Sequence, residues 1–187
     1  MDSLEALELA ERKQIDRLRP KAFTDLLSIS NNSYLIKGLL DSGAMSLIYG
    51  ETNVGKTFFV LDLAIHVALG QPFFDCNVNT GRVLYIAAEM GTGIKNRLKA
   101  IQKHYQIDDI ENFYAICASI NLCSNQEDLR VIIEQIKKVG KFDLIIIDTL
   151  SRALAGGHEN SPDDMGKFIR NCDILREHTD AHVLIVH

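Results

Sequence analysis

The sequence lacks the features that would place it in a membrane, outside the cell or on a strongly charged partner. No apolar run reaches the roughly 20 residues of a bilayer-spanning helix, and the N-terminus opens on an acidic, charge-rich stretch instead of a secretion signal. The four cysteines form no C-x-x-C pair. The formal charge of −5 is small, and the lysines and arginines are scattered. We therefore expect a cytoplasmic protein with reduced, mostly buried thiols, no membrane association and at most local contact with DNA.

The chain does contain enough apolar material for one domain. Apolar residues make up 47% of the 187, so a buried core is expected but a second full domain is not. We divide the chain into residues 1–33, an N-terminal amphipathic helix with a polar, irregular connecting segment, and residues 34–187, a core domain. Leu and Ile at near-helical spacing predict the helix over 4–19, and Pro20 ends it. Its apolar face has two equally good partners, its own domain or a neighbouring subunit.

From residue 45 onward, short β-rich runs alternate with helix-period stretches, an order typical of a parallel sheet covered by helices. The strands are predicted at 45–49, 83–88, 113–116, 144–147 and 182–186. Helices are predicted at 56–69, where Gly70 ends the helix, and at 94–104. A third helix is predicted after a capping box of Ser124 and Glu127, and a fourth after Ser161-Pro162. The fold class is therefore α/β, a three-layer sandwich with a mainly parallel sheet.

A phosphate-binding loop follows the first of these strands and opens the first helix. The segment Gly50-Glu51-Thr52-Asn53-Val54-Gly55-Lys56-Thr57 matches G-x-x-x-x-G-K-[ST] in full. Its glycines let the backbone curl so that N–H groups point at phosphate oxygens, and the helix adds its positive N-terminal dipole. We expect Lys56 to reach the β- and γ-phosphates and Thr57 to bind Mg²⁺. The predicted nucleotide-binding set is Gly50, Glu51, Thr52, Asn53, Val54, Gly55, Lys56, Thr57 and Phe58.

Two acidic residues end apolar strands of the same predicted sheet. Asp148 closes the run that begins at Phe142, and Glu89 closes the run that begins at Val83. Because the carboxyl ends of parallel strands share one edge, both acids are expected beside the phosphate-binding loop. Asp148 is the candidate for a metal-supporting carboxylate, and Glu89 for the group that polarises the attacking water. The plainer interpretations are an ordinary strand-ending Asp and a helix-capping or solvated Glu.

An ordered series of segments over residues 34–187 resembles the RecA-like P-loop ATPases of the RepA-type hexameric replicative helicase group. The series comprises the phosphate-binding loop, Glu89, Ile147-Asp148-Thr149-Leu150-Ser151-Arg152, Glu159-Asn160-Ser161, Met165 and Val183-Leu184-Ile185-Val186-His187. Similar proteins are frequently encoded by plasmids or phages.

The resemblance implies ATP bound with Mg²⁺ and hydrolysed, with Lys56 and Glu89 catalytic and Asp148 as the Walker B residue. His187 would take the sensor position, on the strand that lies between the loop-bearing strand and the Walker B strand. The plainer interpretation of His187 is a C-terminal histidine. The resemblance further implies a homo-oligomer, a hexameric ring, that takes single-stranded DNA and completes each site with an arginine from a neighbouring subunit.

Similar proteins continue past the position at which this sequence stops, on the apolar strand that ends in His187. Their further strands carry DNA-contacting elements and the arginine. We therefore expect a fragment, with the core truncated after the sensor strand.

Other functions fit the same motifs. One is a recombination or regulatory switch ATPase of the RecA/KaiC type, which does not unwind DNA, and another is nucleotide binding without turnover. A small-molecule phosphotransferase is disfavoured, because its arginine-rich lid is missing and the arginines are dispersed at Arg97, Arg130, Arg152, Arg170 and Arg176. Arg152, followed by Gly156-Gly157-His158, is expected in a long surface loop, with a channel-lining loop as the alternative.

Overall fold

The computed structural model describes residues 18–28, 34–88 and 93–187 and divides the chain into two compact units, Met1–Ser33 and Tyr34–His187. The predicted helix at 4–19 lies almost entirely outside the described residues. Within the first unit, the segment predicted to be irregular contains a short helix, α2 (Phe23–Ser28). Asp25 in its first turn is favourably placed for the helix dipole, which the irregular composition did not indicate.

The second unit alternates strands and helices along the chain. It begins with a small antiparallel hairpin of β1 (Tyr34–Ile36) and β2 (Leu40–Asp41). The elements that follow are β3 (Met45–Ile48), α3 (Lys56–Leu69), β4 (Val83–Ala87), α4 (Gly93–Tyr105), β5 (Phe113–Cys117), α5 (Gln126–Val139), β6 (Leu144–Asp148), α6 (Leu150–Ala153), α7 (Pro162–Thr179) and β7 (His182–Val186).

Five of these strands form one parallel sheet in the order β3-β7-β6-β4-β5. This order confirms the predicted α/β class. It also places β7 between β3 and β6, the position that the resemblance implied for the sensor strand.

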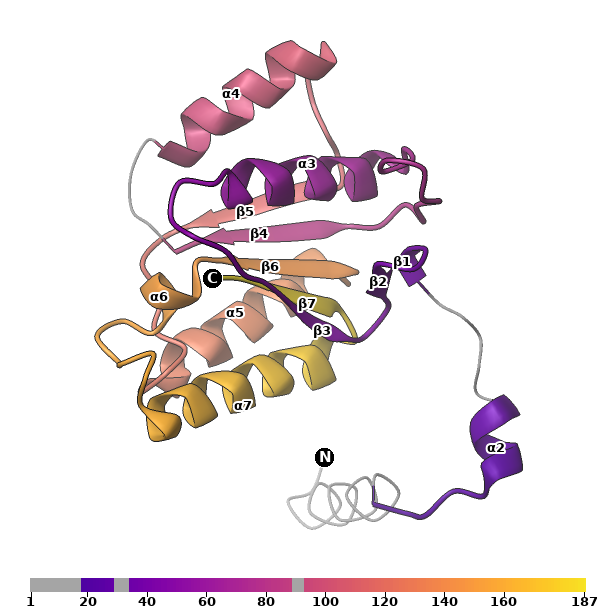
Figure 1. Cartoon of the computed structure of the whole chain (residues 1–187), viewed down its shortest axis with the longest axis vertical. Coiled ribbons are helices and arrows are strands. Elements are labelled where there is room, and N and C mark those ends of the chain that lie inside the picture. Colours follow the sequence, from indigo (N-terminus) through magenta and orange to yellow (C-terminus); the bar gives the residue numbers. More distant parts are fainter. Residues whose placement is uncertain (1–17, 29–33, 89–92) are drawn as a thin grey trace. The chain divides into compact units, whose positions relative to one another are not determined.

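Helices cover both faces of the sheet, so its central strands are buried (Figure 1). Successive side chains of a strand point to opposite faces. On β4, Leu84 and Ile86 pack with the core beneath α5 and α7, whereas Val83 and Tyr85 pack with the core beneath α3 and α4. The near-continuous apolar runs in the sequence are therefore explained by two separate cores, one on each face.

The helix ends follow capping rules, with one correction. Ser161 caps α7 through the Asp164 N–H with Pro162 in the first turn, and Gly70 caps the end of α3, as predicted. The predicted Ser124 cap is wrong, because Asn125 is the N-cap of α5 and its side chain accepts from the Glu127 N–H. Asn makes this bond to the N–H two residues on more readily than Ser does.

The four cysteines are free, and their burial differs from the expectation. Cys123 and Cys172 are buried, but Cys76 is half-buried and Cys117 is exposed. Cys117 ends β5, an edge strand with one neighbour, so the apolar sequence around it does not bring full burial. None of the described helices is long and apolar enough to cross a membrane.

A buried histidine joins the hairpin to the sheet. His182, at the start of β7, is 1% exposed; its Nδ1 lies 2.6 Å from the Asp41 carbonyl oxygen and its Nε2 lies 2.7 Å from the Ser46 hydroxyl. Since a carbonyl only accepts, Nδ1 carries the hydrogen and Nε2 accepts from Ser46. Burial lowers the pKa of His182, against a smaller raising effect of Asp41. The neutral ring therefore ties β2 and β3 to β7.

This arrangement predicts a loss of stability in mild acid. As the pH falls, His182 binds a proton in the unfolded chain near the ordinary pKa of about 6.5, and in the folded protein only at lower pH. The contribution of neutral His182 to the free energy of unfolding is therefore complete above that pH and decreases below it. The free energy of unfolding of His182→Gln should be lower than that of the wild type by about 1–3 kcal/mol at pH 7.5, because a buried hydrogen bond is disrupted. It should also show a shallower decline toward pH 5.5. Urea unfolding at several pH values measures both effects, and equal pH slopes in the two proteins would contradict the assignment.

Candidate nucleotide-binding site

The phosphate-binding loop connects β3 to α3 and is anchored to β7 by main-chain hydrogen bonds. The Gly50 N–H donates to the His187 carbonyl at 3.1 Å, and the His187 N–H donates to the Ile48 carbonyl at 2.8 Å. Within the loop, Asn53 and Gly55 have φ values of 68° and 94°. Left-handed residues in a loop can turn successive N–H groups toward a common concave side, which suits anions.

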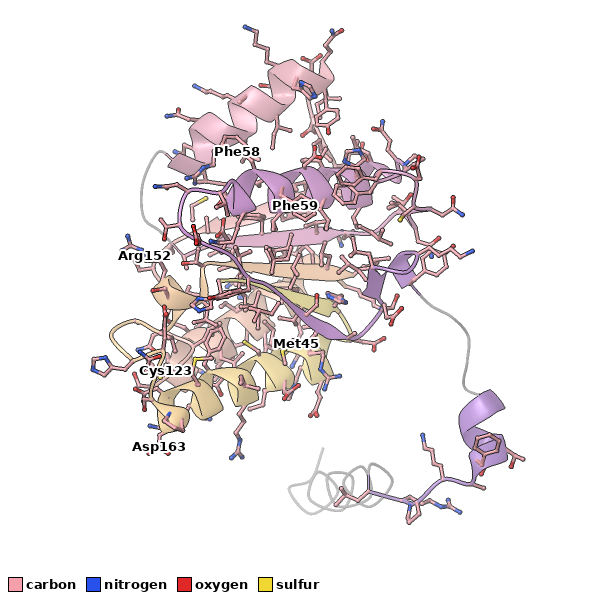
Figure 2. All side chains as sticks on the ribbon, viewed as in Figure 1. Met45, Phe58, Phe59, Cys123, Arg152 and Asp163 are labelled. Atoms are coloured by element: carbon pink, nitrogen blue, oxygen red, sulfur yellow. The ribbon has the colours of Figure 1, made fainter. Side chains whose placement is uncertain are left out.

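The loop forms one wall of a cleft of about 790 Å³. All of the nine predicted nucleotide-binding residues except Val54 line it, and Val54 is exposed instead. Figure 2 shows Phe58, near the start of α3, and Arg152, on α6, toward the same end of the sheet. Tyr49, directly before the loop, also lines the cleft, and the remaining lining residues come from four other parts of the chain: Arg97, Thr149, Ser151, Arg152, Glu159 and His187.

Lys56 folds back over the loop. Its ammonium donates to the carbonyl oxygens of Gly50 and Glu51, the latter at 2.7 Å. These bonds hold a positive charge above the N-terminal half of the loop. Neutral carbonyls are weaker partners than phosphate oxygens, so the ammonium can exchange them for a charged ligand.

Asp148 ends β6 and is 7% exposed. Its Oδ2 accepts a hydrogen bond from the Tyr85 hydroxyl, and its buried Oδ1 has no hydrogen-bond partner among the described residues. A buried carboxylate oxygen without a partner is costly unless a cation or a bound water satisfies it. This orphaned oxygen is the observation that fits a magnesium site.

A metal at this site would depend on the nucleotide as well as the protein. The described residues contain no group of three His, Cys, Asp or Glu side chains that could hold a metal by themselves. Mg²⁺ typically uses one or two protein oxygens together with phosphate oxygens and waters. Thr57 and Asp148 are the residues that would supply the protein side of such a site.

Glu89, the predicted catalytic residue, lies outside the described residues. The residue before it, Ala88, donates its N–H to the Asp148 carbonyl at 2.9 Å. This bond places the chain that leads into Glu89 at the carboxyl end of β6. The role of Glu89 stays a prediction.

His187 lies in the cleft beside the loop. Its ring centroid is 5.4 Å from that of Tyr49, and its Nε2 is 3.8 Å from Glu159 Oε2. Glu159 belongs to the segment between α6 and α7, so His187 joins that segment to the start of the phosphate-binding loop. The structure thus brings Lys56, Thr57 and His187 to one cleft.

Three residues of the site were missed or misplaced by the sequence reasoning. Arg152 was expected in a surface loop, but it lies in helix α6 and lines the cleft. Arg97 lines the cleft from α4, although the sequence presented it as one of several dispersed arginines. Tyr85 contacts Asp148 from the neighbouring strand. The available signal was the predicted parallel sheet, which puts the start of α4 and the side chains of adjacent strands at the same edge.

The sheet order and the site together define a class of protein. A phosphate-binding loop between β3 and α3, an acid at the end of β6 and one strand between β3 and β6 characterise a RecA-like P-loop ATPase core. A protein-family model described as "AAA domain" matches residues 13–187, and the chain belongs to that family.

Comparison with solved structures gives a distant similarity. The crystal structure of the RadB recombinase is 16% identical, with a TM-score of 0.49, over 78% of this chain and 61% of that chain. The chain therefore spans about three fifths of the RadB recombinase chain. No curated protein matches.

Two glycines with the same positive φ allow a controlled test of the loop. Gly55 and Gly156 both have φ of +94°, and a Cβ added to either meets nothing within 4 Å. Alanine at either position should cost about 1–2 kcal/mol of stability through left-handed strain. Only Gly55→Ala should also weaken ATP binding, by about tenfold or more, because relief of the strain turns the loop N–H groups away.

Urea unfolding and binding of a fluorescent ATP analogue measure the two effects separately. Equal loss of nucleotide affinity in Gly55→Ala and Gly156→Ala would show that the loop conformation is not what binds the nucleotide.

Proposed function

We propose that this chain binds ATP with Mg²⁺ and hydrolyses it as the motor domain of a RepA-like replicative DNA helicase. The observation that carries the proposal is the convergence on one cleft of Lys56, Thr57, Arg97, Arg152 and His187 from separate elements. The buried, unpartnered Oδ1 of Asp148 lies at the end of the strand two away from the loop-bearing strand. Family membership and the RecA-like sheet order support ATP as the nucleotide.

Each residue of the site has a role that follows from its position. The loop N–H groups and the Lys56 ammonium bind the β- and γ-phosphates, and Arg97 and Arg152 add positive charge to the cleft. Thr57 and Asp148 would hold Mg²⁺, Asp148 through a metal-bound water. When bound, Mg²⁺ neutralises charge that develops on the phosphate oxygens. Glu89 orients the attacking water and accepts its proton, and His187 contacts the γ-phosphate end of the cleft.

The proposed assembly is based on the resemblance to RepA-type helicases and not on contacts between subunits. A homo-oligomeric ring, hexameric in this proposal, would bring an arginine of a neighbouring subunit to each cleft and enclose single-stranded DNA. If hydrolysis is coupled to a conformational switch without strand separation, the same site describes a recombination or regulatory ATPase.

Two substitutions separate binding from hydrolysis. Lys56→Ala removes the charge-assisted hydrogen bonds to phosphate and should weaken ATP binding by about 1.5–3 kcal/mol, roughly 10- to 100-fold. Glu89→Gln keeps the shape but not the base, so binding should persist while hydrolysis falls by about 100-fold or more. Fluorescent-analogue binding and phosphate release are the measurements, with Lys99→Ala, an exposed lysine of α4, as the control. Hydrolysis retained in Glu89→Gln would move the catalytic role to another residue.

The helicase proposal makes a further prediction about DNA. Hydrolysis should rise several-fold when single-stranded DNA is added and much less with duplex DNA, and strand displacement should require ATP. The assay follows phosphate release and release of a fluorescent strand from a forked duplex. Hydrolysis that is indifferent to single-stranded DNA would reject the helicase and favour the switch ATPase.

A further inference from the structure

We propose that Tyr85 is a positioning residue for the metal site: its hydroxyl holds one oxygen of the Asp148 carboxylate so that the other oxygen faces the metal. This inference rests on the proposed function, because Asp148 has a metal role only if the cleft binds a nucleotide with Mg²⁺.

The pairing of β4 with β6 brings the two side chains together. Ala87 pairs with Asp148, and Tyr85, two residues earlier on β4, pairs with Ile146. Residues two apart on a strand share a face, so Tyr85 and Asp148 both point toward the core beneath α3. A tyrosine is long enough to span the diagonal between them, and its hydroxyl donates to Asp148 Oδ2.

Burial fixes the position of that hydroxyl. Tyr85 is 0% exposed, and its ring centroid lies 6.2 Å from that of Phe113 on the neighbouring strand. On its other side, Asp148 pairs with Val186, an apolar residue that offers no side-chain hydrogen bond. Packing therefore fixes the tyrosine ring, and the tyrosine fixes the carboxylate.

The chemistry of the pair keeps the bond in one direction. A carboxylate oxygen only accepts, so the Tyr85 hydroxyl is the donor. Arg97, which lines the cleft, lies close enough to this pair to act on it electrostatically. With Oδ2 held from below, Oδ1 is the oxygen left for a metal-bound water.

A purely structural role would not need the hydroxyl. The other residues of β4 on this face, Val83 and Ala87, are apolar, and phenylalanine would fill the same space as Tyr85. The hydroxyl hydrogen-bonds to the carboxylate. Without this bond, the two carboxylate oxygens could exchange places by rotation about Cβ–Cγ. Groups that orient metal ligands in this way commonly change metal affinity about 10- to 100-fold when they are removed.

Tyr85→Phe tests the inference by metal binding and not by turnover. Mn²⁺ serves as the probe, and its free concentration is measured by electron paramagnetic resonance in the presence of a saturating non-hydrolysable ATP analogue. Loss of the hydroxyl should weaken Mn²⁺ binding by about tenfold or more and leave analogue affinity in EDTA unchanged. Unchanged Mn²⁺ affinity would overturn the inference.

Tyr105→Phe is the matched control. It removes another tyrosine–aspartate hydrogen bond, from the Tyr105 hydroxyl to Asp62 Oδ1, which joins α4 to α3. Mn²⁺ affinity should match wild type in this variant. In the Asp148→Asn background, Tyr85→Phe should have no further effect on Mn²⁺ affinity, whereas an additive loss would contradict a route through Asp148.

A second measurement serves if Tyr85→Phe does not fold. The chain has five tyrosines, so carbon-13 labelling at tyrosine Cζ gives five signals. Phenylalanine variants of Tyr34, Tyr49, Tyr105 and Tyr114 identify four of them and leave Tyr85 as the fifth. Adding Mg²⁺ to the analogue complex should shift the Tyr85 signal, and an unmoved signal would overturn the inference. If wild type binds no analogue at all, the proposed function fails instead.

Discussion

The common direction of β3, β7, β6 and β4 is the constraint on which the site depends. In the register of these strands, Ile48, Val186, Asp148 and Ala87 lie opposite one another, so the four strands end at nearly the same height. The loop, the acid and the histidine then emerge at one edge, although almost 140 residues separate Gly50 from His187. An antiparallel neighbour would carry its terminal residue to the opposite edge.

Lys56, which lines the cleft, and Asp148, which ends strand β6, differ in how strongly they are enclosed. Lys56 is half-buried and donates to two loop carbonyls, whereas Asp148 is enclosed by the sheet and accepts from a buried tyrosine. Burial makes a carboxylate more dependent on its partners, because water no longer screens it. The position of the carboxylate is thus set by buried partners, and that of the ammonium by neutral carbonyls that a charged ligand can replace.

Local patterns in the sequence were sufficient for the five strands of the parallel sheet and for the loop between β3 and α3, but they did not predict the hairpin strands β1 and β2. The loop motif depends on spacing within eight residues, and buried parallel strands have runs that are apolar throughout, so both can be recognised without knowing their neighbours. The contacts of Tyr85 and Arg97 depend on which strand lies beside which and in what register. Neither is encoded in a local window, and neither was predicted.

Short-range competition explains the smaller errors. Two capping residues stand side by side at the start of α5, and the Ser124–Glu127 spacing predicted the wrong one because it ignored the stronger tendency of Asn125 to accept from the N–H two residues on. Arg152 fell in a helix of one turn, which is too short for a periodic signal.

The main-chain bonds between Gly50, His187 and Ile48 have a consequence for how such a site can evolve. The histidine ring can be replaced by any other side chain except that of proline, which has no N–H, while the peptide groups stay bonded. The connection to Glu159, in contrast, depends on side chains alone. The main-chain link between the loop and β7 therefore persists when residue 187 becomes any residue but proline, whereas the link to the segment between α6 and α7 is lost when either side chain changes.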